Sequence, residues 1–349
     1  MKGVILCAGN GTRMQPFSYT MPKTLLPVAN RPLLDHCIRK MQAAGIEEIA
    51  VVINPAQKRL EDYVRAYQGA KLRLLYQKEP RGIAHALMAA KSFLRRSPFV
   101  LLLGDNLIAE PLSTMLGSFR GKEASVLLAR VEKPQEYGIA EVEGERIVRL
   151  TEKPAQPKSD LAVIGAYAFR ASIFEAIRRL QPSARGEYEI TDAIQTLITD
   201  GRPVAFSVTQ RPYFDVGTVP RWLAANRWML EAEQGAAVQV GADTSLENVV
   251  LRGPVQIGDG CRLKDAVIGP YVSVQDQCEL IDCRIEDSLV LQGARVAHVE
   301  VPMRRSILGA RSRLEGRTAA AGESVELLIG DLSQVRWLTA GEERAKDGT

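Results

Sequence analysis

The chain has 349 residues, enough for two domains, and its 46% hydrophobic and 25% charged content is ordinary for a soluble globular protein. Its 45 basic and 41 acidic residues leave a net charge of only +4 and form no dense basic run. This balance argues against nucleic-acid binding. No apolar run approaches the ~20 residues that span a bilayer, so we expect no membrane partner either.

The five cysteines are odd in number and widely scattered, and no CxxC pair or Cys/His metal spacing occurs. Residues 1–8 enter an apolar core strand directly and do not have the form of a signal peptide. These features predict free, reduced thiols and a cytoplasmic location.

The first two thirds of the chain alternate short apolar runs with amphipathic stretches, a pattern typical of an α/β sheet. The predicted strands are residues 4–6, 49–53, 72–76, 99–103, 125–131, 138–142, 162–169 and 204–208. The predicted helices are residues 33–44, 83–94, 172–180, 190–199 and 220–233. The fold class that this order predicts is a Rossmann-like α/β domain.

The pattern changes near Gly235, beyond which helical periodicity disappears. Branched aliphatic residues then recur every five or six positions: Ile257, Leu263, Ile268, Val274, Leu280, Ile285 and Leu291. A repeat of this kind indicates a parallel β-helix, in which each coil buries its apolar side by stacking on the next. We therefore predict an α/β domain over residues 1–235 and a β-helix domain with a C-terminal tail over 236–349. A β-sandwich of short strands is the alternative.

A glycine loop follows the first predicted strand in the run Leu6-Cys7-Ala8-Gly9-Asn10-Gly11-Thr12-Arg13. Glycine lets backbone N–H groups approach a phosphate closely. The run matches neither the Walker loop nor the dinucleotide fingerprint. The glycines alone are equally compatible with an isolated tight turn.

Two cations near this loop favour phosphate binding. Arg13 follows the loop at once, and Lys23 comes ten residues later in Pro22-Lys23-Thr24-Leu25-Leu26-Pro27-Val28. An arginine can hold two phosphate oxygens, and a lysine adds a compact positive charge. Cations so placed stabilise the charge that builds on a departing pyrophosphate.

Two aspartates are predicted to hold a metal ion. Asp105 follows the apolar strand 99–103, and ligands of open α/β sheets bind at the carboxyl ends of such strands. Mg²⁺ prefers one or two carboxylates together with phosphates and water. Asp215, in Phe214-Asp215-Val216-Gly217-Thr218, is the expected second ligand. A helix cap or a turn is the alternative role for each aspartate.

A third motif, Gln77-Lys78-Glu79-Pro80-Arg81-Gly82, is suited to a nucleobase. A glutamine amide offers a donor and an acceptor, which suits the O4/N3–H edge of uracil or thymine. Gly82 allows the backbone to approach the base. The nearby His85 is interpreted as a packing residue of a helix.

With these motifs the chain resembles the sugar nucleotidylyltransferases, most of all the long form of the glucose-1-phosphate thymidylyltransferases, which carries a C-terminal left-handed β-helix. The resemblance extends from Met1 to about Trp337 and includes the tail runs 267–271 and 329–335. Some positions depart from the family pattern. Cys7-Ala8 replaces the usual Ser/Ala-Gly pair, Ala184 replaces an aromatic residue, and 214–218 is more similar to the short enzymes.

The resemblance implies a role for each site residue. Arg13, Lys23 and Asp105 would be catalytic, and Asp105 and Asp215 would hold Mg²⁺. The nucleotide-binding residues would be Leu6, Ala8, Gly9, Gly11, Thr12, Arg13, Lys23, Gln77, Pro80 and Gly82. The sugar-phosphate residues would be Gly138, Glu152, Lys153, Gly165, Tyr167, Arg185 and Glu187, with Lys153 and Arg185 on the phosphate.

The expected reaction is Mg²⁺-dependent transfer of a nucleotidyl group from dTTP to glucose 1-phosphate, and UTP is the alternative nucleotide. Two other hypotheses are a bifunctional uridylyltransferase–acetyltransferase, for which His298 is the only histidine of the repeat region, and a regulatory homologue without catalysis. We expect the β-helix to serve assembly or an effector, and the protein to be a homo-oligomer.

Overall fold

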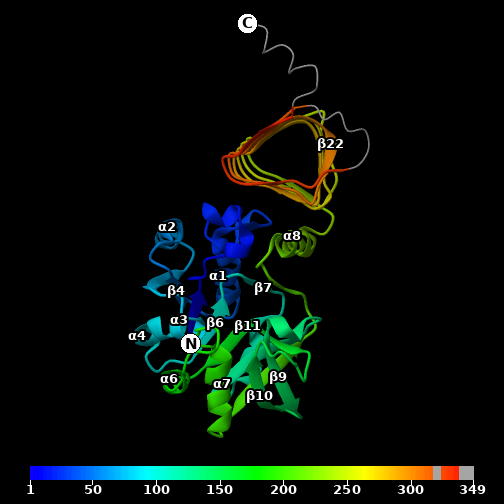
Figure 1. Cartoon of the computed structure of the whole chain (residues 1–349). Helices are drawn as coiled ribbons and strands as arrows, with labels where there is room; N and C mark the ends of the chain where they lie inside the picture. Colours follow the sequence, from blue (N-terminus) through cyan, green and yellow to red (C-terminus); the bar gives the residue numbers. More distant parts are fainter. Residues whose placement is uncertain (317–323, 338–349) are drawn as a thin grey trace. The chain divides into compact units, whose positions relative to one another are not determined.

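The two patterns in the sequence correspond to two architectures in the computed structural model, which describes residues 1–316 and 324–337 (Figure 1). One compact unit comprises residues 1–10, 22–25 and 33–215. The other comprises residues 11–21, 26–32 and the chain from 216 onward. The predicted boundary at residues 235 and 236 falls between a long helix and the first β-helix strand, and it remains a proposal.

A nine-stranded sheet with the path β10-β9-β11-β6-β1-β4-β5 forms the centre of the first unit, and β8 and β12 extend it beside β11. β5, β4, β1 and β6 are parallel, whereas β11 runs antiparallel to β6 and β8. The bounds are β1 (Lys2–Leu6), β4 (Glu48–Ile53), β5 (Lys71–Tyr76), β6 (Phe99–Leu103), β8 (Ala124–Arg130), β9 (Gly138–Glu143), β10 (Arg146–Glu152), β11 (Leu161–Phe169) and β12 (Val204–Thr209). The predicted α/β fold is confirmed.

The helices of this unit bury their apolar sides. Ala84 and Leu87 of α3, Phe174 of α6 and Ile194 of α7 join strand residues such as Val4 in one apolar core. The bounds are α1 (Leu33–Ala43), α2 (Lys58–Ala66), α3 (Ile83–Ala89), α4 (Lys91–Leu94), α5 (Leu112–Ser118), α6 (Ile173–Arg178) and α7 (Ile190–Thr199). The predicted helix 83–94 is divided at Ala90, whose N–H bonds the carbonyl of Leu87 in a tighter turn.

Several elements had no prediction. α2 buries only Leu60 and Val64, so its charged sequence carries little apolar periodicity. Two short strands, β7 (Asn106–Ile108) and β13 (Tyr213–Asp215), pair antiparallel and place Asp215 opposite Asn106. Neither strand is long enough to show a period, yet together they bring position 215 beside the end of β6.

The second unit contains the predicted β-helix, which Figure 1 shows end-on as a three-sided coil in yellow to red. One sheet joins β14 (Val238–Val240), β17 (Val255–Ile257), β19 (Val272–Val274), β21 (Ser288–Val290), β23 (Ile307–Leu308) and β25 (Leu328–Ile329). The other joins β15 (Ser245–Glu247), β18 (Arg262–Ile268), β20 (Glu279–Glu286), β22 (Arg295–Arg304), β24 (Arg313–Glu315) and β26 (Gln334–Arg336), with β16 (Val250–Leu251) beside β18.

The apolar series predicted from the sequence lines the interior of this coil. Ile257 stands beside Val274, Leu263 beside Leu280, and Ile268 beside Ile285, so equivalent side chains stack from coil to coil. All seven residues of the series are at most 5% exposed. The β-helix and the period that predicts it are confirmed.

Two short N-terminal segments belong to this second unit together with α8 (Val219–Gln234). Phe17 packs edge-on against Trp222 with ring centroids 5.4 Å apart, and the Trp222 indole N–H donates to the Pro27 carbonyl at 2.6 Å. Asn30 donates to the carbonyl of Val274 in the coil. The residues between the glycine loop and α1 are therefore largely packed against the C-terminal half of the chain.

Within the described residues no helix is long and apolar enough to cross a membrane. All five cysteines are free and buried. Burial raises the pKa of the Cys37 thiol to about 12, so this thiol stays protonated and unreactive near neutral pH.

Asn226 gives a test of the packing in the second unit. It is 1% exposed, and its Oδ1 accepts from the Ala29 N–H at 2.9 Å and from the Ser273 hydroxyl at 2.8 Å. Asn226→Leu should lower the free energy of unfolding by about 2 kcal/mol or more, because it leaves two buried donors without an acceptor. Ser273→Ala removes only one donor and should cost about 1 kcal/mol. Equal losses of stability in denaturant unfolding would contradict this account.

Candidate active site

The candidate site begins where β1 and β6 end. The chain passes from β1 to β4 on one side and later returns to β6 on the other side of β1. Such a reversal of strand order opens a crevice at the carboxyl ends of the strands. The Gly104 N–H still bonds the Leu6 carbonyl at 2.9 Å, so the two loops leave the sheet together.

The loop after β1 is fixed by a side chain that the sequence did not single out. The Gln57 amide donates to the carbonyls of Cys7 at 3.1 Å and Gly9 at 3.3 Å. A Cβ built on Gly9 meets no protein atom within 4 Å. Packing within the protein therefore does not require a glycine here, and the open space beside it is available to a ligand.

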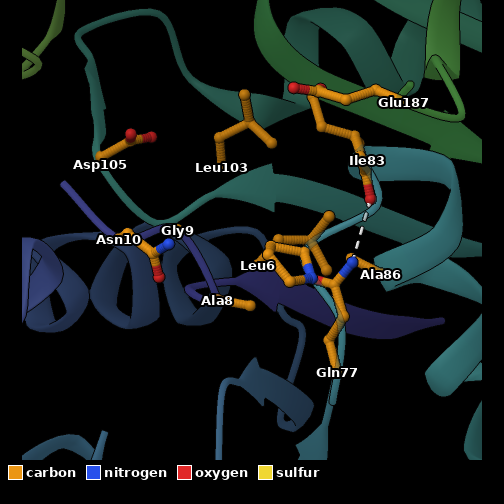
Figure 2. A pocket seen from close by; sticks show the side chains of 12 residues that line it. Leu6, Ala8, Gly9, Asn10, Gln77, Ile83, Ala86, Leu103, Asp105 and Glu187 are labelled. Carbon is orange, nitrogen blue, oxygen red and sulfur yellow. Dashed lines mark hydrogen bonds between the residues drawn. The ribbon is translucent and has the colours of Figure 1, made fainter. Parts of the chain in front are cut away.

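A pocket of about 460 Å³ lies at this edge of the sheet (Figure 2). Eight of its lining residues were predicted as site residues: Leu6, Ala8, Gly9, Gln77, Pro80, Gly82, Asp105 and Glu187. Four were not: Asn10, Ile83, Ala86 and Leu103. Ile83, Ala86 and Leu103 are apolar or small and have no chemical signature in a sequence. Asn10 lies in the glycine loop between two predicted residues, and only that position could have indicated it.

Lys23, Asp105 and Asp215 meet at one point. The Lys23 ammonium lies 2.6 Å from Oδ2 of Asp105 and 3.6 Å from Oδ1 of Asp215. The lysine side chain is 10% exposed, and the two aspartates are 29% and 24% exposed. Three residues far apart in the sequence thus converge, as expected for a shared task.

Two partly exposed carboxylates around one cation are a suitable donor set for Mg²⁺, because this ion takes few protein oxygens. The lysine ammonium shows that a positive charge is already favourable between them. Within the described residues, no group of three or more His, Cys, Asp or Glu side chains is arranged to hold a metal.

Gln77 is held in one orientation at the pocket. Its amide nitrogen donates to the Gly82 carbonyl at 3.2 Å, drawn as a dashed line in Figure 2, and lies 3.1 Å from Nδ1 of His85. Among the described residues nothing donates to its Oε1. Gly82 has φ +95°, and a Cβ there would come within 2.7 Å of the Tyr188 carbonyl. Because the Gln77 amide nitrogen lies within hydrogen-bond distance of His85, His85 orients Gln77. The sequence offered no signal for this role.

Glu152, Arg185 and Gly138 also lie together. The Arg185 guanidinium is 2.8 Å from Glu189, 3.4 Å from Glu152 and 3.8 Å from Glu187. A Cβ on Gly138 would come within 3.0 Å of the Glu152 carboxylate. Arg185 is thus surrounded by carboxylates, and its predicted contact with phosphate stays a prediction.

Glu189, which the sequence did not single out as a site residue, anchors this group. It is 3% exposed and accepts from the Ser183 hydroxyl and from Arg185, both at 2.8 Å. Burial and the negative charge of Glu189 raise the pKa of Glu152. Its position, two residues after Glu187 in a charged run, did not distinguish it from a surface residue.

The remaining predicted sugar residues have particular backbone or burial features. Gly165 has φ +76°, and a Cβ there would collide with the Asn106 amide. Tyr167 is 3% exposed, and burial raises its pKa, with a further contribution from the charge of Glu152. Lys153 holds φ +40°, a region that costs a non-glycine residue free energy and is often found at functional sites.

Gly11, Thr12 and Arg13 belong to the second unit. Gly11 has φ +62° and precedes the 3-10 helix Thr12–Met14. Within this helix Met14 is fully buried whereas Arg13 is exposed. The segment therefore presents the guanidinium to solvent and anchors itself through the next side chain.

Comparison with known proteins identifies the family. Residues 2–232 match the nucleotidyl transferase family model. The chain belongs to this family. It is 33% identical over 317 residues to a glucose-1-phosphate thymidylyltransferase of Streptomyces griseus, covering 86% of this chain and 89% of that protein.

This nucleotidyltransferase is also similar to proteins with names other than glucose-1-phosphate thymidylyltransferase. It is 39% identical over 237 residues to the low-salt glycan biosynthesis nucleotidyltransferase Agl11 of Haloferax volcanii, covering 66% of each chain. A crystal structure of UDP-glucose pyrophosphorylase complexed with UDP-glucose aligns with a TM-score of 0.61 and 26% identity, covering 66% of this chain and 99% of that one.

The raised pKa of Glu152 predicts a pH-dependent stability of the nucleotidyltransferase. An acid whose pKa is higher in the folded state destabilises the fold when ionised, and this cost grows as the pH rises from the unfolded pKa through the folded pKa. Glu152→Gln should therefore gain stability relative to the wild type as the pH rises above the usual glutamate pKa of about 4. Denaturant unfolding at several pH values measures this difference, and a difference that shrinks with rising pH would contradict the assignment.

Proposed function

We propose that the protein transfers a nucleotidyl group from dTTP to glucose 1-phosphate with Mg²⁺, giving dTDP-glucose and pyrophosphate, and that UTP is an alternative donor. The observation that carries the proposal is the convergence of Lys23, Asp105 and Asp215, because Asp105 also lines the pocket that contains Gln77. The family assignment supports the reaction type, and the residue roles below are part of the proposal.

The orientation of Gln77 supports a uracil or thymine base. Its amide nitrogen already faces Gly82 and His85, so Oε1 is the atom left to receive a ligand donor. Uracil and thymine carry a donor at N3, whereas N3 of cytosine is an acceptor. We therefore assign Oε1 to the N3–H of the base, with Pro80, Ala8 and Leu6 forming the apolar walls of the pocket.

The triphosphate would be bound by the backbone of Gly9, Gly11 and Thr12 and by the side chains of Arg13 and Lys23. Lys23 is engaged with two carboxylates in the ligand-free chain. Asp105 and Asp215 outweigh its single charge and would repel a triphosphate. Mg²⁺ held by the two aspartates would offset this repulsion, and Lys23 would then donate to a phosphate oxygen.

Asp105 and Asp215 would hold the Mg²⁺ ion, which when bound neutralises phosphate charge and orients the phosphate oxygens. Glu152 and Glu187 would accept from sugar hydroxyls, with Gly138, Gly165 and Tyr167 forming the floor of the sugar site. Lys153 would neutralise the sugar phosphate, and Arg185 would hold the two glutamates and approach the same phosphate.

In the reaction a phosphate oxygen of the sugar phosphate attacks the α-phosphorus in line. The bond from the α-phosphorus to the bridging oxygen breaks, and pyrophosphate leaves toward Arg13 and Lys23. The attacking phosphate is already an anion, so no general base is required. Orientation of the two substrates and charge neutralisation supply the catalysis.

The relatives' names support both nucleotides, because one is a thymidylyltransferase and another a UDP-glucose pyrophosphorylase. We also propose a homo-oligomer. The first coil of the β-helix exposes Val238, Val240, Leu246 and Val250 at 38–50%, and β14, β15 and β16 each pair on one side only within the described residues. The five free thiols support the proposed cytoplasmic location.

A substrate matrix tests the proposed activity. Purified protein with Mg²⁺ should release pyrophosphate from dTTP or UTP with glucose 1-phosphate, and the rates with the two should differ modestly. Their bases differ by one methyl, worth about 0.8 kcal/mol or about fourfold when buried, and a pocket discriminates strongly on the 2′-hydroxyl only if it is built to bind it. Preference for ATP, GTP or CTP would refute the role of Gln77. Turnover of acetyl-coenzyme A by the purified protein, measured separately, would support the bifunctional alternative.

Replacing Lys23 tests the catalytic centre. Lys23→Met keeps the length of the side chain and should lower kcat by about 10²–10³, because charge on the leaving pyrophosphate loses its partner. The KM for the sugar phosphate should change little. Lys58→Met, at an exposed lysine of α2, is the control. Unchanged pyrophosphate release by a folded Lys23→Met variant would remove Lys23 from the mechanism.

A further inference from the structure

One corner of the β-helix carries a ladder of aspartates. Oδ1 of Asp259 accepts from the Ala242 N–H at 2.7 Å, and Oδ1 of Asp276 accepts from the Asp259 N–H at 2.9 Å. In a later coil, Oδ1 of Asp331 accepts from the Ala310 N–H at 2.7 Å. In each case the carboxylate caps the backbone of the preceding coil, which is a structural role.

Asp331 differs from the other two because its second carboxylate oxygen bonds a residue outside the coil. Oδ2 of Asp331 accepts from the Thr20 hydroxyl at 2.5 Å. The neighbouring Gly330 faces Pro16, and a Cβ there would lie 3.2 Å from the Pro16 side chain. Residues 16–20 are therefore held against this coil by a charge-assisted hydrogen bond and by close backbone packing.

The held segment leads directly to Arg13. Thr20 follows the 3-10 helix Phe17–Tyr19, which packs on the 3-10 helix Thr12–Met14. Phe17 and Met14 are both fully buried. A segment with two buried anchors and a fixed end has little freedom, so a displacement at Thr20 should be transmitted to the exposed Arg13.

We propose that Asp331, acting through Thr20, is a positioning residue for Arg13, so that the β-helix sets how well the enzyme binds and turns over its nucleotide. This inference rests on the proposed function, which assigns Arg13 to the triphosphate. In this proposal Asp331 does not contact a substrate. The β-helix thereby contributes to nucleotide affinity without lining the pocket described above.

The test compares variants at both ends of the hydrogen bond. Thr20→Val removes the donor at nearly constant shape. Asp331→Asn keeps an oxygen for the Ala310 N–H and replaces the charged acceptor at Thr20 with an uncharged NH2 group. Each should reduce kcat/KM for the nucleotide by about threefold to tenfold and leave the KM for the sugar phosphate unchanged. Thr20→Ser restores the hydroxyl and should return kcat/KM to within about twofold of the wild type. The double variant Thr20→Val/Asp331→Asn should have a kcat/KM for the nucleotide no lower than that of the less active single variant.

Asp276→Asn is the matched control, since it alters the same corner of another coil, where the carboxylate caps the Asp259 N–H. Within the described part of the chain, no hydrogen bond joins the Asp276 side chain to residues 11–21. It should leave the nucleotide kinetics unchanged. Hydrogen exchange of peptides covering residues 11–21 gives a readout independent of activity, and it should speed up in Thr20→Val but not in Asp276→Asn.

Two results overturn the inference. Unchanged exchange in Thr20→Val means that Asp331 does not hold the segment, and faster exchange with unchanged nucleotide kinetics means that the segment does not position Arg13. Failure of the proposed function gives a different result from these two. In that case the wild type turns over no pyrimidine nucleotide, or Arg13→Ala is as active as the wild type. The exchange measurement still decides in that case whether Asp331 restrains the segment.

Discussion

The ammonium of Lys23 between Asp105 and Asp215 is the interaction around which the candidate site of the first unit is assembled. The three groups come from residues 22–25, from the end of β6 and from β13, so the pairing of β13 with β7 and the inclusion of the short segment 22–25 are both required to assemble them. Charges removed from water are costly unless they are paired, and a hydrophobic replacement of similar shape is often as stable. The presence of the cluster is therefore better explained by chemistry than by stability.

The same argument applies to the residues that we predict to bind the sugar phosphate. Three glutamates at positions 152, 187 and 189 surround the single guanidinium of Arg185, and Glu152 is partly buried with a raised pKa. An arrangement with more carboxylates than cations does not serve folding, since like charges repel and burial opposes ionisation. Perturbed groups of this kind gather where a ligand completes the electrostatics. Unequal numbers of carboxylates and cations at both clusters are therefore consistent with the charged substrates proposed above.

The parts of the site that the sequence predicted are those with a local signature. Asp105 follows a run of buried aliphatic residues, and Gln77 comes shortly before Gly82, which adopts φ +95°. In both cases the neighbouring residues in the sequence indicate the site residue. Gln57 was missed because it acts by a hydrogen bond to a distant segment, which leaves no local pattern. Glu189 was missed because its partners Ser183 and Arg185 lie in the same charged run, where nothing in the sequence separates a buried carboxylate from a surface one. The β-helix was predictable because each coil requires buried aliphatic side chains at equivalent positions, which produces a repeat in the sequence. The pairing of β7 with β13 was not, because each strand has only three residues.

The course of the chain explains why a sequence motif and a folding unit need not coincide. The chain passes between the two units after residues 10, 21, 25, 32 and 215, so the run from Gly9 to Val28 is divided among them. Gly9 and Lys23 fold with the sheet, whereas Arg13 folds with α8 and the β-helix. Phe17 packs on Trp222, and Thr20 and Asn30 bond to residues of the coil, so these segments depend for most of their packing on the last third of the sequence. A C-terminal domain that contributes no predicted catalytic group is thereby part of the structure that holds one.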